Sequence, residues 1–202
     1  MTLAGNNDRG AALAHDEMRT MRAEALAEKL SESQDDIDLM AAARALAAMG
    51  PRAIDAVPVL CTVIATSDAP RIAAAAFVLS EIGAGASDRA PEVVGLLVNR
   101  LNDHHTDVRY WVLTALGRMG SPVAEVVMQV ASRLEDDEES IRAAAAQALG
   151  ELAENAEKAS GHLLSALYDS SDEVRKAAAF ALARVDPDGR KTLPMLRQAL
   201  RA

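Results

Sequence analysis

Hydrophobic residues recur along this chain at the spacing of α-helices. Alanine-rich stretches such as Asp38–Leu46 and Ile141–Leu149 combine the residue of highest helix propensity with a side chain small enough for neighbouring helices to approach closely. A second stretch follows each of them, with apolar residues at i, i+3 and i+7, for example Val57, Leu60 and Ile64. That stripe is typical of an amphipathic helix. The pattern predicts an all-α protein built from paired helices.

The helix pair repeats in register five times. The leucines that mark the register are Leu46, Leu79, Leu116, Leu149 and Leu182. Their spacings are 33, 37, 33 and 33 residues, and we place the insertion of the second spacing between Gly83 and Asn102. A glycine follows each of the first three leucines after four residues and suits a helix C-cap, where positive φ costs glycine nothing. Self-similarity at a fixed period predicts a stacked repeat protein.

The N-terminal region does not follow the repeat. Met18–Leu30 is a helical stretch without a partner, and we expect it to cap the stack because terminal repeats are atypical. Residues 1–10 are polar and are predicted to form a flexible N-terminus, followed by a single repeat domain over 11–202. The N-terminus lacks the basic start and apolar stretch of a secretory signal, so we expect a cytoplasmic protein.

Composition narrows the classes of function. Half of the residues are hydrophobic, only 2% are aromatic, and the net charge is −9. The apolar content excludes a disordered chain, and no continuous apolar run approaches the roughly 20 residues of a membrane span. An acidic protein lacks the basic footprint that nucleic-acid binding needs. The one cysteine, Cys61, excludes a disulfide framework, and its apolar setting predicts a small core residue.

Three turns share a further signature, an aspartate followed six residues later by an arginine. The pairs are Asp103 with Arg109, Asp136 with Arg142, and Asp169 with Arg175. Each arginine leads into a helix, and the string from Asp172 to Leu182 closely resembles a HEAT repeat. The short unit is similar to the compact HEAT-like repeats that include the phycobilisome-lyase type.

This resemblance implies a right-handed α-solenoid of about five two-helix repeats with an N-terminal capping helix. It also implies that the aspartates and arginines form a structural ladder along the stack, for which the planar arginine fork is suited. The ladder positions hold Ser33 and Leu39 in the first unit, and Thr66 and Ile72 in the second. We therefore expect packing to hold the N-terminal end.

A partner-binding surface is predicted on the second helix of each pair, since the resemblance implies that second helices line the concave face of the stack. The residues selected there avoid the apolar stripe: Asp55, Asp88, Glu92, Glu125, Gln129, Lys158, His162 and Lys191. Their charge runs from acidic to basic along the chain, which would give a bound partner a preferred direction. A solvated helix face with an accidental charge order is the alternative.

Two other clusters are candidates for chemistry or binding. His104 and His105 stand on a turn and are of the type that binds zinc, but consecutive side chains diverge and no third histidine is near in sequence. Tyr110 and Trp111 stand out in an aromatic-poor chain. We expect one ring to pack and the other to be exposed on the outer face.

The sequence thus favours a non-catalytic scaffold that binds a protein partner, because it carries no nucleophile elbow, phosphate-binding loop or metalloprotease motif. No enzymatic activity, cofactor, metal, nucleic acid or membrane is expected. The resemblance keeps open a phycobilin lyase-type subunit or a chaperone-like accessory factor. A HEAT-like DNA glycosylase ranks last, since the chain has few lysines and a surplus of acids.

Overall fold

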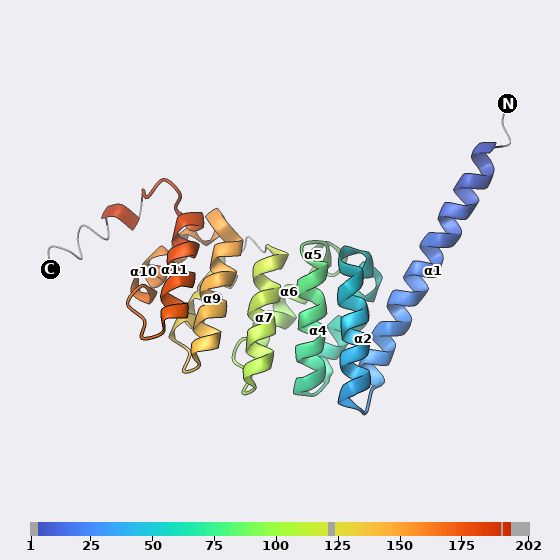
Figure 1. Ribbon diagram of the computed structural model, residues 1–202, viewed down its shortest axis with the longest axis horizontal. Helices are drawn as coiled ribbons and strands as arrows, with labels where there is room; N and C mark the ends of the chain where they lie inside the picture. The colour runs from blue at the N-terminus through green and yellow to red at the C-terminus, as the bar shows by residue number, and fades with distance from the viewer. Residues whose placement is uncertain (1–3, 121–123, 191, 195–202) are drawn as a thin grey trace.

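The structure is a computed structural model that describes residues 4–120, 124–190 and 192–194, with side chains from Asp16 onward except that of Glu154. Within these ranges every regular element is a helix and no strand occurs. The helices stack side by side in chain order (Figure 1). The predicted all-α solenoid is therefore confirmed.

Five helices of 14 residues each form one layer of the stack, hereafter the first layer. They are α2 (Asp36–Met49), α4 (Ala69–Ile82), α7 (Thr106–Met119), α9 (Glu139–Leu152) and α11 (Asp172–Val185). Each of these helices begins after a polar turn. At the start of α2, for example, the Asp35 carboxylate accepts a hydrogen bond from the Ile37 N–H. Residues of positive φ end the first three, at Gly50, Gly83 and Gly120, where glycine avoids the steric cost of that conformation.

The returning segments form a second layer of shorter helices. They are the 3₁₀ helix η1 (Gly50–Ala56) with α3 (Val57–Thr66), α5 (Gly85–Arg89) with α6 (Glu92–Asn99), α8 (Ala124–Ser132) with η2 (Arg133–Glu135), and η3 (Ala153–Ala159) with α10 (Ser160–Ala166). The second helix predicted for the fifth pair lies mostly outside the described residues. Four complete pairs and the first helix of a fifth are thus described.

The N-terminal helix α1 (Ala4–Glu32) is longer than the predicted Met18–Leu30. It packs on the open end of the stack through buried Ala23, Ala27 and Leu30, and its N-terminal part runs past the stack (Figure 1). Residues 4–10 belong to this helix, whereas the sequence predicted a separate N-terminal segment over 1–10. The alanines that follow them favour helix and account for the continuation; residues 1–3 lie outside the described part.

One continuous hydrophobic core joins the two layers from Ala23 to Val185. Leucines, isoleucines and valines of both layers fill it, and the first layer adds a large share of buried alanines. Within Asp36–Thr66, a window of 18 residues has a mean hydropathy of 1.4, so this stretch is long and apolar enough to cross a membrane by length and composition. Arg44 and Arg52 interrupt this segment, and several of its large apolar side chains, among them Leu46 and Ile64, are buried in the core of the stack.

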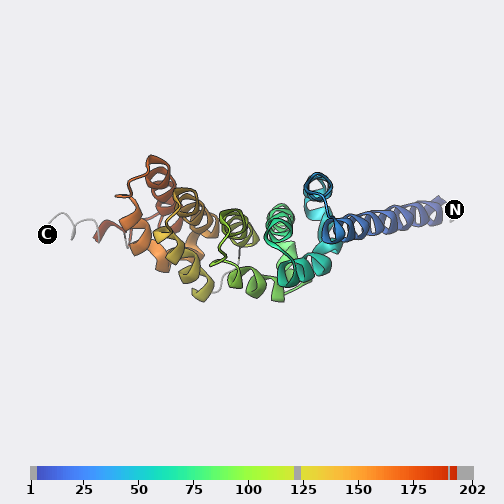
Figure 2. The same cartoon turned by 90° about the horizontal axis from the view of Figure 1, so that it is seen from below.

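The stack is curved, with the first layer on the inside of the arc and the second layer on the outside (Figure 2). Small residues bring the first-layer helices close together: a Cβ added at Gly117 of α7 would lie 2.8 Å from the Cα of Ala148 in α9. A Cβ at Gly150 would lie 3.1 Å from the Cα of Ala181 in α11. Because the layer with the closer spacing takes the inner radius, the first helices line the concave side.

Candidate protein-binding surface

The aspartate–arginine pairs connect neighbouring repeats. The Nη2 of Arg109 donates to Asp136 Oδ1 at 3.0 Å, and Arg142 donates from Nε and Nη2 to the two oxygens of Asp169 at 2.7 and 2.9 Å. Each arginine also donates from Nη1 to the backbone of its own turn, as Arg142 does to the Asp136 carbonyl at 3.0 Å. Arg109 and Arg142 therefore tie their helices both to their own turns and to the next repeat, whereas the described contacts of Arg175 stay within its own repeat.

The charges of this ladder stabilise one another. Hydrogen bonds from Arg142 lower the pKa of Asp169, and the same contact raises the pKa of Arg142. Asp103, at the start of the ladder, instead meets His105, whose backbone N–H and ring Nδ1 lie 3.0 Å from its Oδ1. Burial acts to raise the pKa of Asp103, but these hydrogen bonds outweigh it and the net shift is downward.

Polar contacts also join the N-terminal repeats, where packing was expected to contribute more than the ladder. Arg71 donates to the carbonyl of Ser33 and pairs with Asp68. Arg100 donates from Nε and Nη2 to the carbonyl of Ile64 at 3.1 and 2.7 Å. These arginines bind backbone carbonyls at the C-terminal ends of helices, whereas the later ones bind carboxylates, so an Asp-to-Arg motif search does not find them.

The residues predicted to bind a partner lie on the second layer. Asp55 is in η1, Asp88 in α5, Glu92 in α6, Glu125 and Gln129 in α8, Lys158 in η3 and His162 in α10, while Lys191 lies outside the described residues. The second layer is on the convex side, so the prediction that these residues line the concave face is corrected. Asp55 is moreover partly buried and accepts a hydrogen bond from Thr20 at 2.8 Å. Partner binding by the remaining residues stays a prediction.

The concave side carries a groove over α2, α4 and α7, hereafter the inner groove. Its volume is about 580 Å³. The small residues Pro70, Ala73 and Ala74 of α4 form its floor, because larger side chains stand on the helices to either side. The residues that complete its lining are Asp36, Leu39, Met40, Arg44, Phe77, Asp107 and Trp111. A hollow of this size suits a ligand or a peptide segment.

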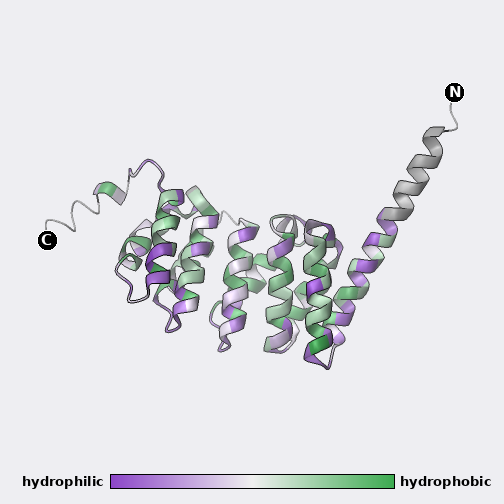
Figure 3. Cartoon of the chain, viewed as in Figure 1, coloured by the Kyte–Doolittle hydropathy of each residue, from purple (hydrophilic) through white to green (hydrophobic). Residues whose placement is uncertain are grey.

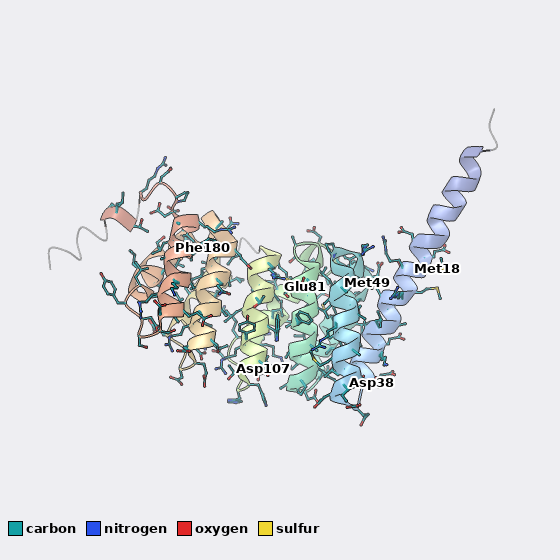
Figure 4. The ribbon with its side chains drawn as sticks, in the orientation of Figure 1. Met18, Asp38, Met49, Glu81, Asp107 and Phe180 are labelled. Carbon is teal, nitrogen blue, oxygen red and sulfur yellow. The ribbon has the colours of Figure 1, made fainter. Side chains whose placement is uncertain are left out.

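Aromatic rings gather at this groove. Phe77 and Trp111 contact each other with ring centroids 4.7 Å apart, and Tyr110 meets Trp111 edge to face at 5.1 Å. Trp111 is half-buried against the core, while Tyr110 is 36% exposed. One ring is thus packed and the other exposed, as expected, but the exposed ring lies on a first-layer helix of the inner side. Phe180 of α11 adds a further exposed ring to this layer (Figure 4).

Charge on the concave side is sorted by position. The polar turns that precede the first-layer helices form its lower edge, drawn in purple in Figure 3. Acids follow in the first turns of α2, α7, α9 and α11, though not of α4, and two of them, Asp36 and Asp107, line one end of the inner groove (Asp107 is labelled in Figure 4). Farther along the helices, Arg44 lines the groove and Arg118 pairs with Glu81 at 2.6 Å.

The structure places the histidine and cysteine candidates in different surroundings. His104 and His105 are exposed, and across the residues with described side chains no three His, Cys, Asp or Glu groups gather as metal ligands would. Cys61 is buried, and burial raises the pKa of its thiol to about 11, so it stays protonated near neutral pH. The features that remain suit recognition of another molecule.

Comparison of this chain with known proteins identifies a matching protein family and several solved structures of similar fold. A family model of HEAT repeats matches residues 73–150 and again 96–183, more than half of the chain. No curated protein matches it in sequence. An engineered protein from a structural genomics consortium superposes with a TM-score of 0.64 at 26% identity over 81% of this chain and 78% of that one.

Two further solved structures share the fold. A designed armadillo repeat protein in complex with the peptide (KR)4 has a TM-score of 0.63 and 21% identity, over 87% of this chain and 90% of its own. The complex of CpcE and CpcF of phycocyanin lyase from Nostoc sp. has a TM-score of 0.62 and 21% identity, over 79% and 96%. At these identities the likeness concerns the fold alone.

Proposed function

Since the chain belongs to the HEAT repeat family, we propose that it is a non-catalytic scaffold that binds a partner protein along the concave side of its first layer. The observation that carries the proposal is the concentration of accessible apolar side chains on that layer. Ile37 and Met40 of α2 are 78% and 39% exposed, and Met40 lines the inner groove; Phe180 of α11 is 62% exposed and lines a second hollow over α9 and α11. Exposed apolar patches rimmed by polar residues are typical of protein-interaction sites.

Similar folds support a binding role. The designed armadillo repeat protein holds a peptide, and CpcE and CpcF form a complex with each other. A curved stack of helices presents many side chains to an extended partner and requires no catalytic group in an exact position. The rings of Tyr110, Trp111 and Phe180 are of the residue types that dominate binding energy at interfaces.

Matched surface variants test which side binds. The variant Tyr110→Ala plus Phe180→Ala removes two exposed rings of the concave side, and Glu92→Lys plus Glu125→Lys reverses two exposed charges of the convex side. Affinity capture from the native lysate, compared by mass spectrometry, should lose the specific partner only with the first variant. Circular dichroism checks that both variants fold. Loss of capture with the convex variant alone would overturn the proposal.

A bilin-binding subunit is a second candidate, favoured by the fold shared with CpcE and CpcF and by the groove volume. This candidate ranks lower because a bilin carries two negatively charged propionates. In the groove only Arg44 would attract them, whereas Asp36 and Asp107 would repel them. Titration of the protein with free bilin separates the two. A saturable shift of bilin absorbance would favour the lyase-type role.

A further inference from the structure

We infer that the inner groove takes one extended segment of the partner, in which an apolar side chain fills the hollow and a basic residue two positions earlier lies at the end of the groove that Asp36 and Asp107 line. The inference rests on the proposed function and specifies its partner. It follows from the shape of the groove, from the position of its charges and from its length.

The shape calls for an apolar anchor. The groove is lined by the alanines of α4, by Met40 of α2 and by Trp111 of α7, and Phe77, farther along α4, contacts the Trp111 ring. Both rings are only half-buried, so each has a face that a bound side chain can cover. A leucine or phenylalanine would gain both burial and ring contact there, and methionine at the wall adapts to either shape.

The charges call for a cation at one end. Asp36 and Asp107 are exposed, and among the described residues neither carboxylate forms an ion pair, unlike Asp38, which pairs with Lys29 at 3.2 Å. Their place in the first helical turn also favours their helices, but a carboxylate there keeps lone pairs for a second partner. The two carboxylates stand on α2 and α7 with α4 between them, so a lysine or arginine at this end would pair with one of them and be attracted by the charge of the other.

The length of the groove fixes the motif and its direction. Asp36 and Arg44 are eight residues apart on α2, so about 12 Å separates the acidic end from Arg44. An extended chain spans this distance in about four residues, and side chains two positions apart point to the same side. The segment therefore has a basic residue, an apolar residue two positions later, and a carboxylate or carbonyl facing Arg44.

Trp111 provides the measurement, because it is the single tryptophan of the chain and lines the groove. The probe is a synthetic peptide with blocked ends and the central sequence Lys-Ser-Phe-Ser-Glu, flanked by serine and glycine. Titration should give a saturable blue shift of Trp111 emission. The variant Asp36→Asn plus Asp107→Asn should weaken binding about tenfold or more, and a peptide with Glu in place of Lys should not bind.

The matched control is Glu139→Gln plus Glu173→Gln, which neutralises exposed first-turn acids of α9 and α11, outside the residues that line the groove. It should leave the affinity unchanged. Equal binding of the Lys and Glu peptides, or no shift at all, would overturn the inference. A shift of Trp111 emission that depends on protein concentration without peptide would assign the groove to a second copy of the chain and would also overturn it.

The two proposals fail separately. If the peptide does not bind but capture from lysate still depends on Tyr110 and Phe180, only the motif is wrong and the scaffold role stands. If capture is unchanged in the Tyr110→Ala plus Phe180→Ala variant, the concave side is not the binding surface, whether or not the peptide binds.

Discussion

The two layers of the stack obey different rules. Each helix of the first layer has 14 residues without interruption, whereas the α-helices of the second layer have between 5 and 10 and are joined to 3₁₀ segments. Backbones nearly touch in the first layer, so one extra residue there would displace every later alanine from its contact. The second layer meets through longer side chains, which absorb irregularity. The regular layer is also the one that presents the proposed binding surface.

The same substitution in the two layers should have opposite effects, and this is the largest difference we predict. Gly117→Ala in α7 forces a Cβ to 2.8 Å from the Cα of Ala148 and should destabilise the protein by about 2–3 kcal/mol. Gly95→Ala in α6 meets no atom within 4 Å and should stabilise it by about 0.5–1 kcal/mol through helix propensity. Urea unfolding followed by circular dichroism measures both. Equal losses would contradict the proposed difference between the layers.

Removal of a ladder carboxylate tests what ties the first layer together. Asp169→Ala leaves Arg142 without its two short hydrogen bonds and the Ser171 N–H without its acceptor at 2.8 Å. We expect a loss of about 2 kcal/mol in the free energy of unfolding, measured in urea. The control Asp137→Ala removes an exposed carboxylate from the preceding turn and should change stability little. A similar loss in both variants would mean that the ladder contributes no specific stability.

The same aspartate predicts a pH dependence. Hydrogen bonds from Arg142 lower the pKa of Asp169 in the folded state below the value of about 3.9 in an unfolded chain. Its contribution is therefore complete above that pH and is lost as the pH falls through the folded pKa. Stability measured from neutral to acidic pH should fall less steeply below about pH 4 in Asp169→Ala than in the unaltered protein. Parallel curves would refute this assignment.

The smallest effect concerns the junction between the layers. Ala153 follows α9 with φ 50° and ψ −131°, nearly the conformation of Gly50 after α2 with φ 54° and ψ −133°. Ala153→Gly should stabilise the protein by about 1 kcal/mol, because a Cβ is strained at this φ. Gly50→Ala is the reverse control and should destabilise it by a similar amount, as thermal unfolding would show. Destabilisation by both substitutions would place the strain elsewhere.

Part of the candidate site could be read from sequence. The spacing of Asp136, Arg142 and Asp169 locates the ladder residues, because the pairing repeats with the period of the units. Tyr110 and Trp111 were recognisable as unusual, but Met40, Phe77 and Ala73 carry no signal of a groove, since each is an ordinary residue of an amphipathic helix. They form one only where α2, α4 and α7 lie side by side.

The periodic leucines and alanines alone determined that this protein is a stack of paired helices, because the 3.6-residue period and the repeat length leave each helix an apolar face that only a neighbouring helix can cover. They did not determine which layer is concave. That depends on the relative spacing of the two layers, which the contacts of Gly117 and Gly150 with neighbouring alanines set across the stack. The curvature depends on the difference between the helix spacing in the first layer and that in the second layer, and both spacings are fixed only when the helices pack.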